Sequence, residues 1–457
     1  MTVNQRIEEE KSRILSSIQV PKPTKLFYPL TFPITRDSLQ AALETYRSVE
    51  IVSAGEPIIL DRPLIFSSDM HLRVPKDQVF EQGRESKLCL VRNLRMQNGA
   101  EHDTDHTCRD ENISISGGIW LMKNNVRAKQ ADTEPFLGAL GAILFAGVNV
   151  ISLSDMVIHD ALDEEKRRGA AYNYGIQLSD CSHFTVKNID FVDNHKDGLH
   201  VNGPAEYGYI RHLRGERLDD DLLALNAWDW YTSAVTYGTI SDIVAEDIVS
   251  NNNELRLLPG RKLYPDGSYV DCDIHNIVLE NISGIYTFKL YAQPNIANAC
   301  NPNIHDVSGT VGNIYNIFFR DISFAEVTPS GLNGLPVKSL FEICADCHDL
   351  FWEDITVANR IADCAALDLH LVNVGPLSAV WKNGSDDPDK WGEVFDPDMI
   401  CHVEGLYFRN IRFAGEEILS CAPLLQAVRL HVNPDYPRTT PRGGTGYGTI
   451  GHAEIAE

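Results

Sequence analysis

Residues 182–202, SHFTVKNIDFVDNHKDGLHVN, contain one copy of the unit that decides the fold. The run Phe184–Ile189 alternates apolar and polar residues and ends in Asn-Ile, and a second alternating run follows at Leu199–Asn202. Alternation with a period of two residues is typical of a β-strand with one buried face. The stretch therefore predicts two short strands, joined through a bend that carries Asp197 and Gly198.

The same unit recurs along most of the chain. Further copies of the pattern apolar-x-apolar-x-(Asn/Asp/Glu)-Ile include ENISISGGIWL, DIVAEDIVSNN, HNIVLENISGI, YNIFFRDISFA, HDLFWEDITVA and EGLYFRNIRFA. Most copies have a second short strand as well, such as GIQLS, LALNA, LRLLP or FKLYA. Consecutive copies lie roughly 22 to 35 residues apart, which is typical of a solenoid. No helices alternate with these strands, so we predict an all-β parallel β-helix rather than a βαβ fold. An antiparallel sandwich is the alternative, but sandwiches seldom keep one unit in register for so long.

The two ends of the chain differ from this repeat. Leu39, Ala42 and Leu43 have helical spacing within Ser38–Arg47, after a cap at Asp37 or Ser38. We therefore predict an N-terminal cap segment at 1–48, a β-helix domain at 49–432 and a Pro/Gly-rich tail at 433–457. Long insertions at 259–271, 292–312 and 373–399 are expected to form loops that wall a cleft.

Composition excludes several classes of function. The 457 residues are 43% hydrophobic and carry a net charge of -24, which argues against a nucleic-acid partner. No apolar run approaches the roughly 18 residues that a membrane span needs. The N-terminus has charges where a signal peptide has its apolar core, so we expect a cytoplasmic protein. The ten cysteines are then reduced thiols, and Cys344-x-x-Cys347 lacks the second pair of a zinc site.

Aligning the second strands places polar side chains in columns on one face. The central column reads Gln177, His200, Ala224, Arg256, Lys289, Glu342, Asp368 and Arg429. The column two residues further on reads Ser179, Asn202, Asn226, Leu258, Tyr291, Cys344, His370 and His431. Three positions before the central column lie Asp197, Asp221 and Asn253. A solvated sheet face would also be polar, but the succession of histidine, carboxylates, arginine and lysine indicates a functional site.

The aspartates of adjacent coils are the candidate catalytic residues. Neighbouring carboxylates repel one another, which raises the pKa of at least one and leaves another ionised. Cleavage of a glycosidic bond requires such a pair. We predict Asp220 as the general acid, with Asp197 and Asp221 sharing the role of base. Asp219 is interpreted as a turn residue, and a turn is also the alternative reading of the other three.

Basic and aromatic residues near these aspartates are the candidate substrate contacts. His200, Arg256 and Lys289 would hold the sugar, and Arg and Lys suit a substrate carboxylate or sulfate. The other predicted substrate-binding residues are Asn226, Trp228, Asn253 and Tyr291. Trp228 could stack on a sugar ring or pack against an adjacent loop. This chemistry needs no cofactor and no metal. A carbohydrate is the predicted partner, with no nucleic acid or membrane, and a homo-oligomer is left open.

These motifs together resemble a known family of enzymes. Asn194-x-x-Asp197-Gly198, then Asp220-Asp221 before an Ala-Leu strand, then an Arg strand and a Lys strand are similar to glycoside hydrolase family 28, the polygalacturonases. The architectural resemblance covers about residues 111–413, and the motifs lie within 194–291. It implies a right-handed parallel β-helix of the pectin-lyase type and inverting hydrolysis of galacturonans and related pectic chains. It also implies that Asp220 is the acid of the Asp-Asp pair.

Three departures from that family affect the substrate-holding positions more than the acids. Asn252-Asn253-Glu254 replaces Gly-His-Gly, and Lys289-Leu290-Tyr291 replaces Arg-Ile-Lys. His195-Lys196 lengthens the first motif. Galacturonate specificity is therefore not implied. The alternatives are a polysaccharide lyase with Arg or Lys as base and aspartates holding Ca²⁺, a sugar (fructosyl) transferase, or a non-catalytic carbohydrate-binding β-helix.

Overall fold

The Asn or Asp of the repeat marks a corner of the fold. In the computed structural model these residues have positive φ, for example 55° at Asn188, 58° at Asp247 and 51° at Asn281. This left-handed conformation costs most residues about 1–2 kcal/mol, but Asn and Asp adopt it more readily. Their side chains also pair between coils: Asn188 Nδ2 donates to Asp155 Oδ1 over 2.8 Å, and Asn281 Nδ2 donates to Asp247 Oδ1 over 2.6 Å. The sequence pattern therefore encodes a bend that is repeated from coil to coil.

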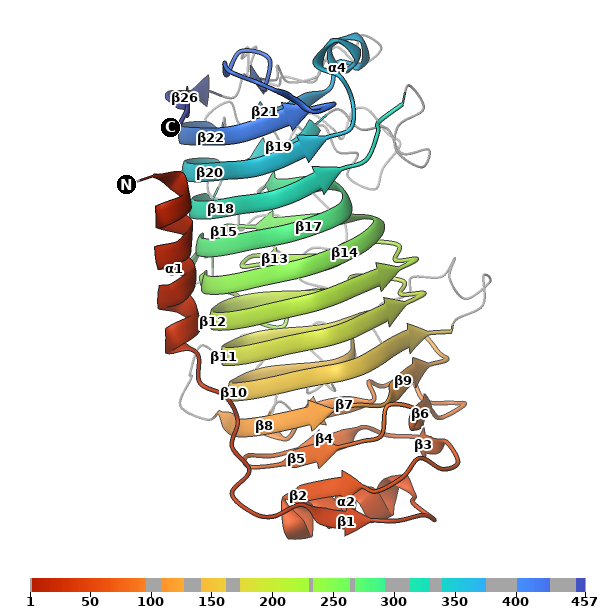
Figure 1. Cartoon of the computed structure of the whole chain (residues 1–457). Coiled ribbons are helices and arrows are strands. Elements are labelled where there is room, and N and C mark those ends of the chain that lie inside the picture. Colours follow the sequence, from red (N-terminus) through yellow and green to blue (C-terminus); the bar gives the residue numbers. More distant parts are fainter. Residues whose placement is uncertain are drawn as a thin grey trace, which may run out of the picture.

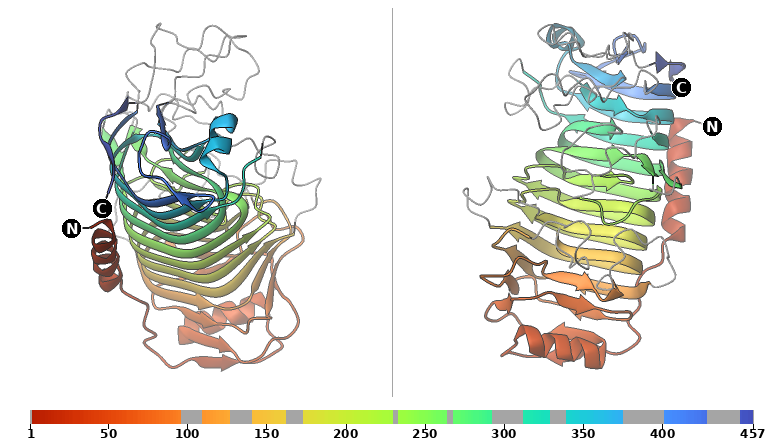
Figure 2. Two further views of the ribbon diagram at one scale, coloured as in Figure 1. Left: turned by 45° about the horizontal axis from the view of Figure 1, so that its top comes forward. Right: turned by 180° about the vertical axis from the view of Figure 1, so that it is seen from behind.

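Stacked coils of parallel strands form the body of the protein (Figure 1). The structure describes residues 2–95, 109–126, 141–161, 173–229, 233–263, 268–291, 312–328, 339–374, 401–427 and 449–456. Each long strand pairs in parallel with the next coil, as β10 does with β11 and β11 with β12. Views from above and behind show the coils wound about one axis (Figure 2). The prediction of a parallel β-helix is confirmed, although the predicted short strands are joined around the corners into longer ones.

The elements of the N-terminal half are α1 (Val3–Ser17), β1 (Tyr28–Leu30), α2 (Arg36–Tyr46), β2 (Ser48–Ile51), β3 (Ile58–Leu60), β4 (Leu64–Phe66), β5 (His71–Arg73), β6 (Val79–Gln82), β7 (Val91–Asn93), β8 (Asp110–Ser116), β9 (Ile119–Met122), β10 (Gly141–Asp160), β11 (Tyr174–Val192), β12 (Leu199–Glu216) and β13 (Leu223–Asn226). Those of the C-terminal half are β14 (Ile240–Leu258), β15 (Gly260–Leu263), β16 (Tyr269–Cys272), β17 (Ile274–Tyr291), β18 (Asn313–Phe324), β19 (Ser339–Cys344), β20 (Asp346–Val357), α4 (Ile361–Leu367), β21 (His370–Val374), β22 (His402–Phe413), β23 (Glu416–Glu417), β24 (Leu425–Ala427), β25 (Thr449–Ile450) and β26 (Ala453–Ile455).

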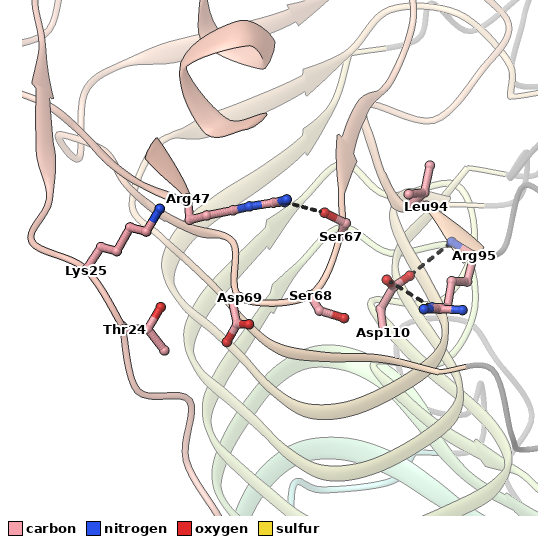
Figure 3. Close-up of a pocket in the computed structure, with 9 residues that line it drawn as sticks. All are labelled: Thr24, Lys25, Arg47, Ser67, Ser68, Asp69, Leu94, Arg95 and Asp110. Carbon is pink, nitrogen blue, oxygen red and sulfur yellow. Dashed lines mark hydrogen bonds and ion pairs between the residues drawn. The ribbon is translucent and has the colours of Figure 1, made fainter. Parts of the chain in front are cut away.

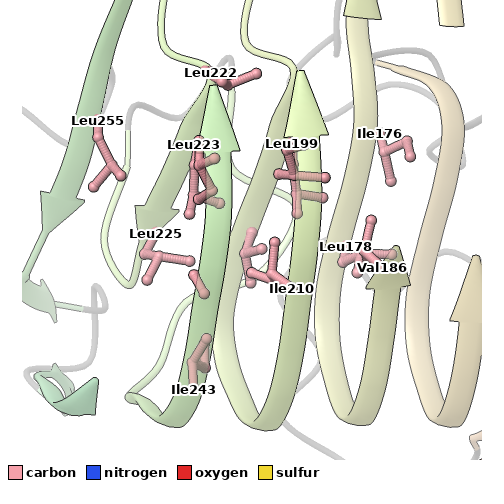
Figure 4. Packing of buried hydrophobic residues seen from close by; sticks show 14 of the residues in the cluster. Ile176, Leu178, Val186, Leu199, Ile210, Leu222, Leu223, Leu225, Ile243 and Leu255 are labelled. Atoms are coloured by element: carbon pink, nitrogen blue, oxygen red, sulfur yellow. The ribbon is translucent and has the colours of Figure 1, made fainter. Parts of the chain in front are cut away.

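Apolar side chains form columns inside the coils. Ile176, Leu199, Leu223, Leu255 and Phe288 lie at paired positions of five successive coils, and all are fully buried. Figure 4 shows the first four of them pointing into the interior. Complete burial of a side chain of this size contributes about 1.5–3 kcal/mol. The columns therefore fix the register that also aligns the polar face.

The predicted polar column is confirmed over most of its length and is wrong at its end. Gln177 through Glu342 occupy paired positions on successive strands, in the predicted order. Glu342 then pairs with Asn373 instead of Asp368, and His370 pairs with Ser339. The reason is that α4 intervenes and Asp368 caps its C-terminus in the left-handed conformation. Arg429 and His431 lie outside the described residues.

Helix α2 covers the first edge of the stack, as Figure 1 shows. Leu39, Ala42 and Leu43 are buried as their spacing predicts. The N-cap is Thr35, not the predicted Asp37 or Ser38: its hydroxyl accepts from the Ser38 amide over 3.2 Å while the Ser38 hydroxyl accepts from the Thr35 amide. This reciprocal pair satisfies two amides that the first turn would otherwise leave unpaired.

Helix α1 runs along the side of the coils instead of across their end (Figure 1). Its buried residues Val3, Ile7 and Ile14 pack in one cluster with apolar side chains of β14, β17, β18 and β20. Lys11 Nζ lies 2.5 Å from a carboxylate oxygen of both Glu246 and Glu280, on adjacent coils. The helix therefore holds several coils together from outside.

The predicted loops are described only in part. The insertion at 259–271 begins with the antiparallel hairpin of β15 and β16, while 292–311 and 375–399 lie outside the described residues. Most of the predicted tail, 433–457, does too; its last residues include β25 and β26, which pair with β22. None of the helices in the described part of the chain is long and apolar enough to cross a membrane. Of the eight described cysteines, seven are buried.

Candidate active site

Two stacked bends carry the predicted catalytic aspartates. Asp197 and Gly198 precede β12, and Asp220 and Asp221 precede β13 on the next coil. The Gly198 amide donates to the Asp221 carbonyl oxygen over 2.9 Å. A Cβ on Gly198 would lie 2.8 Å from the carbonyl oxygen of Leu222. Glycine is therefore required here for close stacking of the coils, and the stacking brings the three side chains to one place.

The carboxylates of Asp197, Asp220 and Asp221 converge. Each offers an oxygen atom within 4.8 Å of those of the other two. The Asp220 side chain is 31% exposed, whereas those of Asp197 and Asp221 are 5% and 0% exposed. The cluster therefore presents one carboxylate to solvent and keeps two behind it.

Burial and mutual repulsion retain protons in this cluster. Burial raises the pKa of Asp197, and the charge of Asp220 adds to the rise against the opposing effect of His200. Burial raises the pKa of Asp221 well above its ordinary value, although Arg256 opposes the shift. Carboxyl groups this close titrate together, so their protons belong to the group as a whole.

Arg256 of β14 supplies a fixed positive charge beside the cluster. Its Nε lies 3.0 Å from Asp221 Oδ2, and its Nη2 lies 3.5 Å from Asp220 Oδ1. The Nε contact is an ion pair without hydrogen-bond alignment, and neither oxygen of Asp221 has an aligned donor among the described groups. Three carboxylates also suit a hard cation such as Ca²⁺. In this structure the Arg256 guanidinium already supplies positive charge beside Asp220 and Asp221.

His200 does not face the site, contrary to its predicted contact with the sugar. Its side chain is 1% exposed and lies between two carboxylates: Nδ1 is 2.5 Å from Asp197 Oδ2, and Nε2 is 3.0 Å from Asp229 Oδ2. Burial opposes the charged imidazolium, but the two carboxylates outweigh it and raise the pKa of His200 to about 10. The charged imidazolium of His200 therefore contacts the Asp197 carboxylate from the protein interior and holds it in position.

Glu254 links the two predicted substrate-binding cations. Its Oε2 lies 2.6 Å from Lys289 Nζ and 3.4 Å from Arg256 Nη2. Its Oε1 accepts the hydroxyl of Tyr286. Glu342, the strand partner of Lys289 on the next coil, has a pKa raised by burial and by the charge of Glu254. Lys289 and Arg256 thus lie in a largely acidic environment.

The remaining predicted contacts support the site from within the protein. Asn253 Nδ2 donates to the carbonyl oxygens of Leu218, over 2.9 Å, and Asp220, over 3.1 Å, and so holds the second bend. Asn226 Nδ2 donates to Asp229 Oδ2 over 3.1 Å. Trp228 is 3% exposed and packs in the hydrophobic core, as the packing alternative predicts. The side chain of Tyr291 lies outside the described part of the structure.

Sequence reasoning missed Asp229 and assigned no role to Glu254. Asp229 follows β13 in a loop and reaches His200 of the preceding coil, and no periodic pattern predicts that contact. Glu254 was visible as a departure from the resembling family, and its period-two relation to Arg256 places both on one face. His195, two residues before Asp197, forms a second buried pair with Asp160.

A separate pocket of about 600 Å³ opens near the N-terminal end of the stack (Figure 3). Its lining residues are Thr24, Lys25, Arg47, Ser67, Ser68, Asp69, Leu94, Arg95 and Asp110. Arg47 Nη1 donates to the Ser67 hydroxyl over 2.7 Å, and Arg95 Nε lies 3.6 Å from Asp110 Oδ1. None of the predicted site residues lines this pocket, so it is distinct from the aspartate cluster.

Solved structures with a similar fold include the exopolygalacturonase of Thermotoga maritima. It aligns with a TM-score of 0.53 and 10% identity over 90% of this chain and 97% of that one. The polygalacturonase of Erwinia carotovora aligns with a TM-score of 0.48 and 10% identity over 90% of this chain and 97% of that one. A tailspike protein mutant of Escherichia coli bacteriophage HK620 aligns with a TM-score of 0.49 and 10% identity over 87% of this chain and 64% of that one.

Similarity to the first of these structures establishes a right-handed parallel β-helix. At this level of identity it establishes the fold and leaves the activity open. No protein-family model and no curated protein matches the sequence.

Proposed function

We propose that the chain is a glycoside hydrolase whose acid and base groups are Asp197, Asp220 and Asp221. The convergence of these three carboxylates, with one exposed and two buried, carries the proposal. Hydrolysis of a glycosidic bond needs a proton donor and a carboxylate at the same bond. The cluster of three carboxyl groups meets both needs: repulsion between the charges keeps a proton on one group while another is ionised.

In this mechanism Asp220 presents the proton of the cluster to the glycosidic oxygen. The bond between that oxygen and the anomeric carbon breaks as the leaving sugar takes the proton. A water molecule then bonds to the anomeric carbon and gives its own proton to Asp197 or Asp221. Transfer of a proton from that residue to Asp220 restores the cluster. The closest carboxylate oxygens lie within 4.8 Å of one another. That is shorter than the roughly 6.5–9.5 Å typical of inverting enzymes, so the product anomer has to be measured.

The positions of the basic residues favour hydrolysis over elimination. A lyase would use Arg256 or Lys289 to abstract a proton from the sugar. In this structure Lys289 Nζ lies 2.6 Å from Glu254 Oε2, and Arg256 Nη2 donates to Asp220 Oδ1 and Glu254 Oε2. Both side chains therefore already donate to carboxylates.

A pair of neighbouring substitutions tests the proposal. Asp220→Asn should reduce kcat on any cleaved oligosaccharide by a factor of about 10² to 10⁴, the usual contribution of a general acid or base. Asp219→Asn is the matched control, because Asp219 is exposed and lies outside the cluster. Substrates are found by screening neutral and uronic oligosaccharides by product mass. Equal turnover by both variants would exclude the mechanism, and products with an unsaturated uronic ring would indicate a lyase.

A further inference from the structure

We propose that Glu254 makes the site select neutral, hydroxyl-bearing sugars over uronic acids. This inference rests on the proposed function and identifies its substrate class. It departs from our sequence-based expectation that Arg256 and Lys289 suit a substrate carboxylate.

Glu254 occupies the place that a substrate carboxylate would need. Glu254 and Arg256 are two residues apart on β14, so their side chains lie on the same face of the strand. Lys289 is the strand partner of Arg256 on the next coil. The Glu254 carboxylate contacts both cations through Oε2, at 2.6 Å from Lys289 Nζ and 3.4 Å from Arg256 Nη2. The protein thus provides an internal carboxylate to both of its candidate anion-binding groups.

A hydrogen bond and burial hold the Glu254 carboxylate in place. Its second oxygen, Oε1, accepts the Tyr286 hydroxyl. Burial, and then the charge of Glu254, raise the pKa of Tyr286, so its hydroxyl remains a donor. The Glu254 side chain is only 13% exposed. Displacing it would leave a buried charge without its partners, which is costly.

Like charges around the cations add a penalty for an anionic ligand. Asp220 contacts Arg256 from the preceding coil, in addition to Glu254 on the same strand as Arg256. A uronate entering beside Lys289 would meet these acidic groups as well as the cation. Repulsion of this kind discriminates between ligands even when attractive contacts are present.

A neutral sugar matches the same surroundings better. A sugar hydroxyl can donate to Glu254 while it accepts from Lys289, because a hydroxyl has both capacities. A substrate carboxylate can only accept hydrogen bonds, so it would pair with Lys289 but would be repelled by the carboxylate of Glu254. The Lys289 side chain is 22% exposed and Asp220 is 31% exposed, so both can reach a ligand at the surface.

The test compares matched pairs of nitrophenyl glycosides that differ only in the group on C5. Galactosides are paired with galacturonides and glucosides with glucuronides, each as the α and the β anomer. We expect wild-type kcat/KM to favour the neutral member of the pair that is cleaved. Glu254→Gln removes the charge at nearly constant shape, and should shift the uronide-to-neutral ratio toward the uronide by roughly tenfold or more, the scale of one charge-assisted hydrogen bond.

Glu246→Gln is the control, since Glu246 lies under α1 and pairs with Lys11. It should leave the ratio unchanged. A wild-type preference for the uronide, or a ratio that Glu254→Gln does not move, would overturn the inference. Calorimetric binding of the same pairs to Asp220→Asn protein separates the two proposals. If wild type cleaves none of the glycosides but the variant still binds the neutral member of each pair more tightly, the proposed hydrolase activity alone is refuted. Tighter binding of the uronide would refute the proposed selectivity.

Discussion

Replacing His200 with Gln should destabilise the protein by removing the positive charge that lies between the buried carboxylates of Asp197 and Asp229. Asp197 and Asp229 contact opposite nitrogens of the ring, at 2.5 and 3.0 Å. Removing one partner of a buried ion pair typically costs about 3–5 kcal/mol because the other charge is left uncompensated. We expect a loss of this size at pH 7 in the free energy of unfolding.

The pH dependence of that loss has a definite sign. The pKa of His200 is raised to about 10 in the folded protein, against about 6.5 in an unfolded chain. Its contribution is therefore fully present below about pH 6.5 and is lost as the pH rises toward about 10, because the native state then binds more protons than the unfolded state. The difference between these pKa values sets a ceiling of about 5 kcal/mol.

Urea unfolding of wild type and His200→Gln, followed by circular dichroism at several pH values between 6 and 10, measures this effect. The two stability curves should converge as the pH rises. His348→Gln is the control, because His348 is 54% exposed and its contact with Asp349, at 3.1 Å, should contribute at most about 1 kcal/mol. Curves that remain parallel across the range would refute the charged state of His200.

Three further substitutions test the packing of the coils. Asn281→Ala should lower the free energy of unfolding by about 1–2 kcal/mol, and Asn281→Gly by less, because only the former strains the left-handed corner; equal losses in urea unfolding would contradict this. Leu225→Ala should cost about 2–5 kcal/mol, since Leu225 is fully buried, and a loss below 1 kcal/mol would show that the coil collapses around the gap. Lys11→Met should cost roughly 1–3 kcal/mol in the same assay, between the values of exposed and buried ion pairs, because Glu246 and Glu280 then face each other. Unchanged stability would show that the ion pairs of Lys11 do not stabilise the packing of α1 on the coils.

Local patterns predicted the fold well because each repeat encodes its own geometry. The Asn-Ile step predicted a recurring unit, and the structure shows that its Asn or Asp forms the corner. Period-two alternation placed Gln177 through Glu342 in the correct column. The register was wrong at Asp368, because α4 inserts residues whose number no periodic pattern reveals. The N-cap was misplaced because Thr35, Asp37 and Ser38 are all good capping residues.

The candidate site was predicted less completely, for a physical reason. Alignment of coils brought Asp197, Asp220 and Asp221 together, since parallel stacking relates equivalent residues directly. It could not show that His200 is buried, because a polar residue on a strand has the same pattern whether it faces solvent or a covering loop. Asp229 was missed since it enters from such a loop. Contacts made by loops depend on tertiary folding, which leaves no period in the sequence.

Cleavage in water enriched in ¹⁸O tests the hydrolytic role of the aspartate cluster most directly. Early products of the cleaved oligosaccharide are analysed by mass spectrometry with wild type, Asp220→Asn and Asp219→Asn. The proposed mechanism predicts one heavy oxygen on the new reducing end of each cleaved chain, formed by wild type and Asp219→Asn and nearly lost with Asp220→Asn. Products without heavy oxygen, or the same labelled product formed equally well by Asp220→Asn, would contradict it.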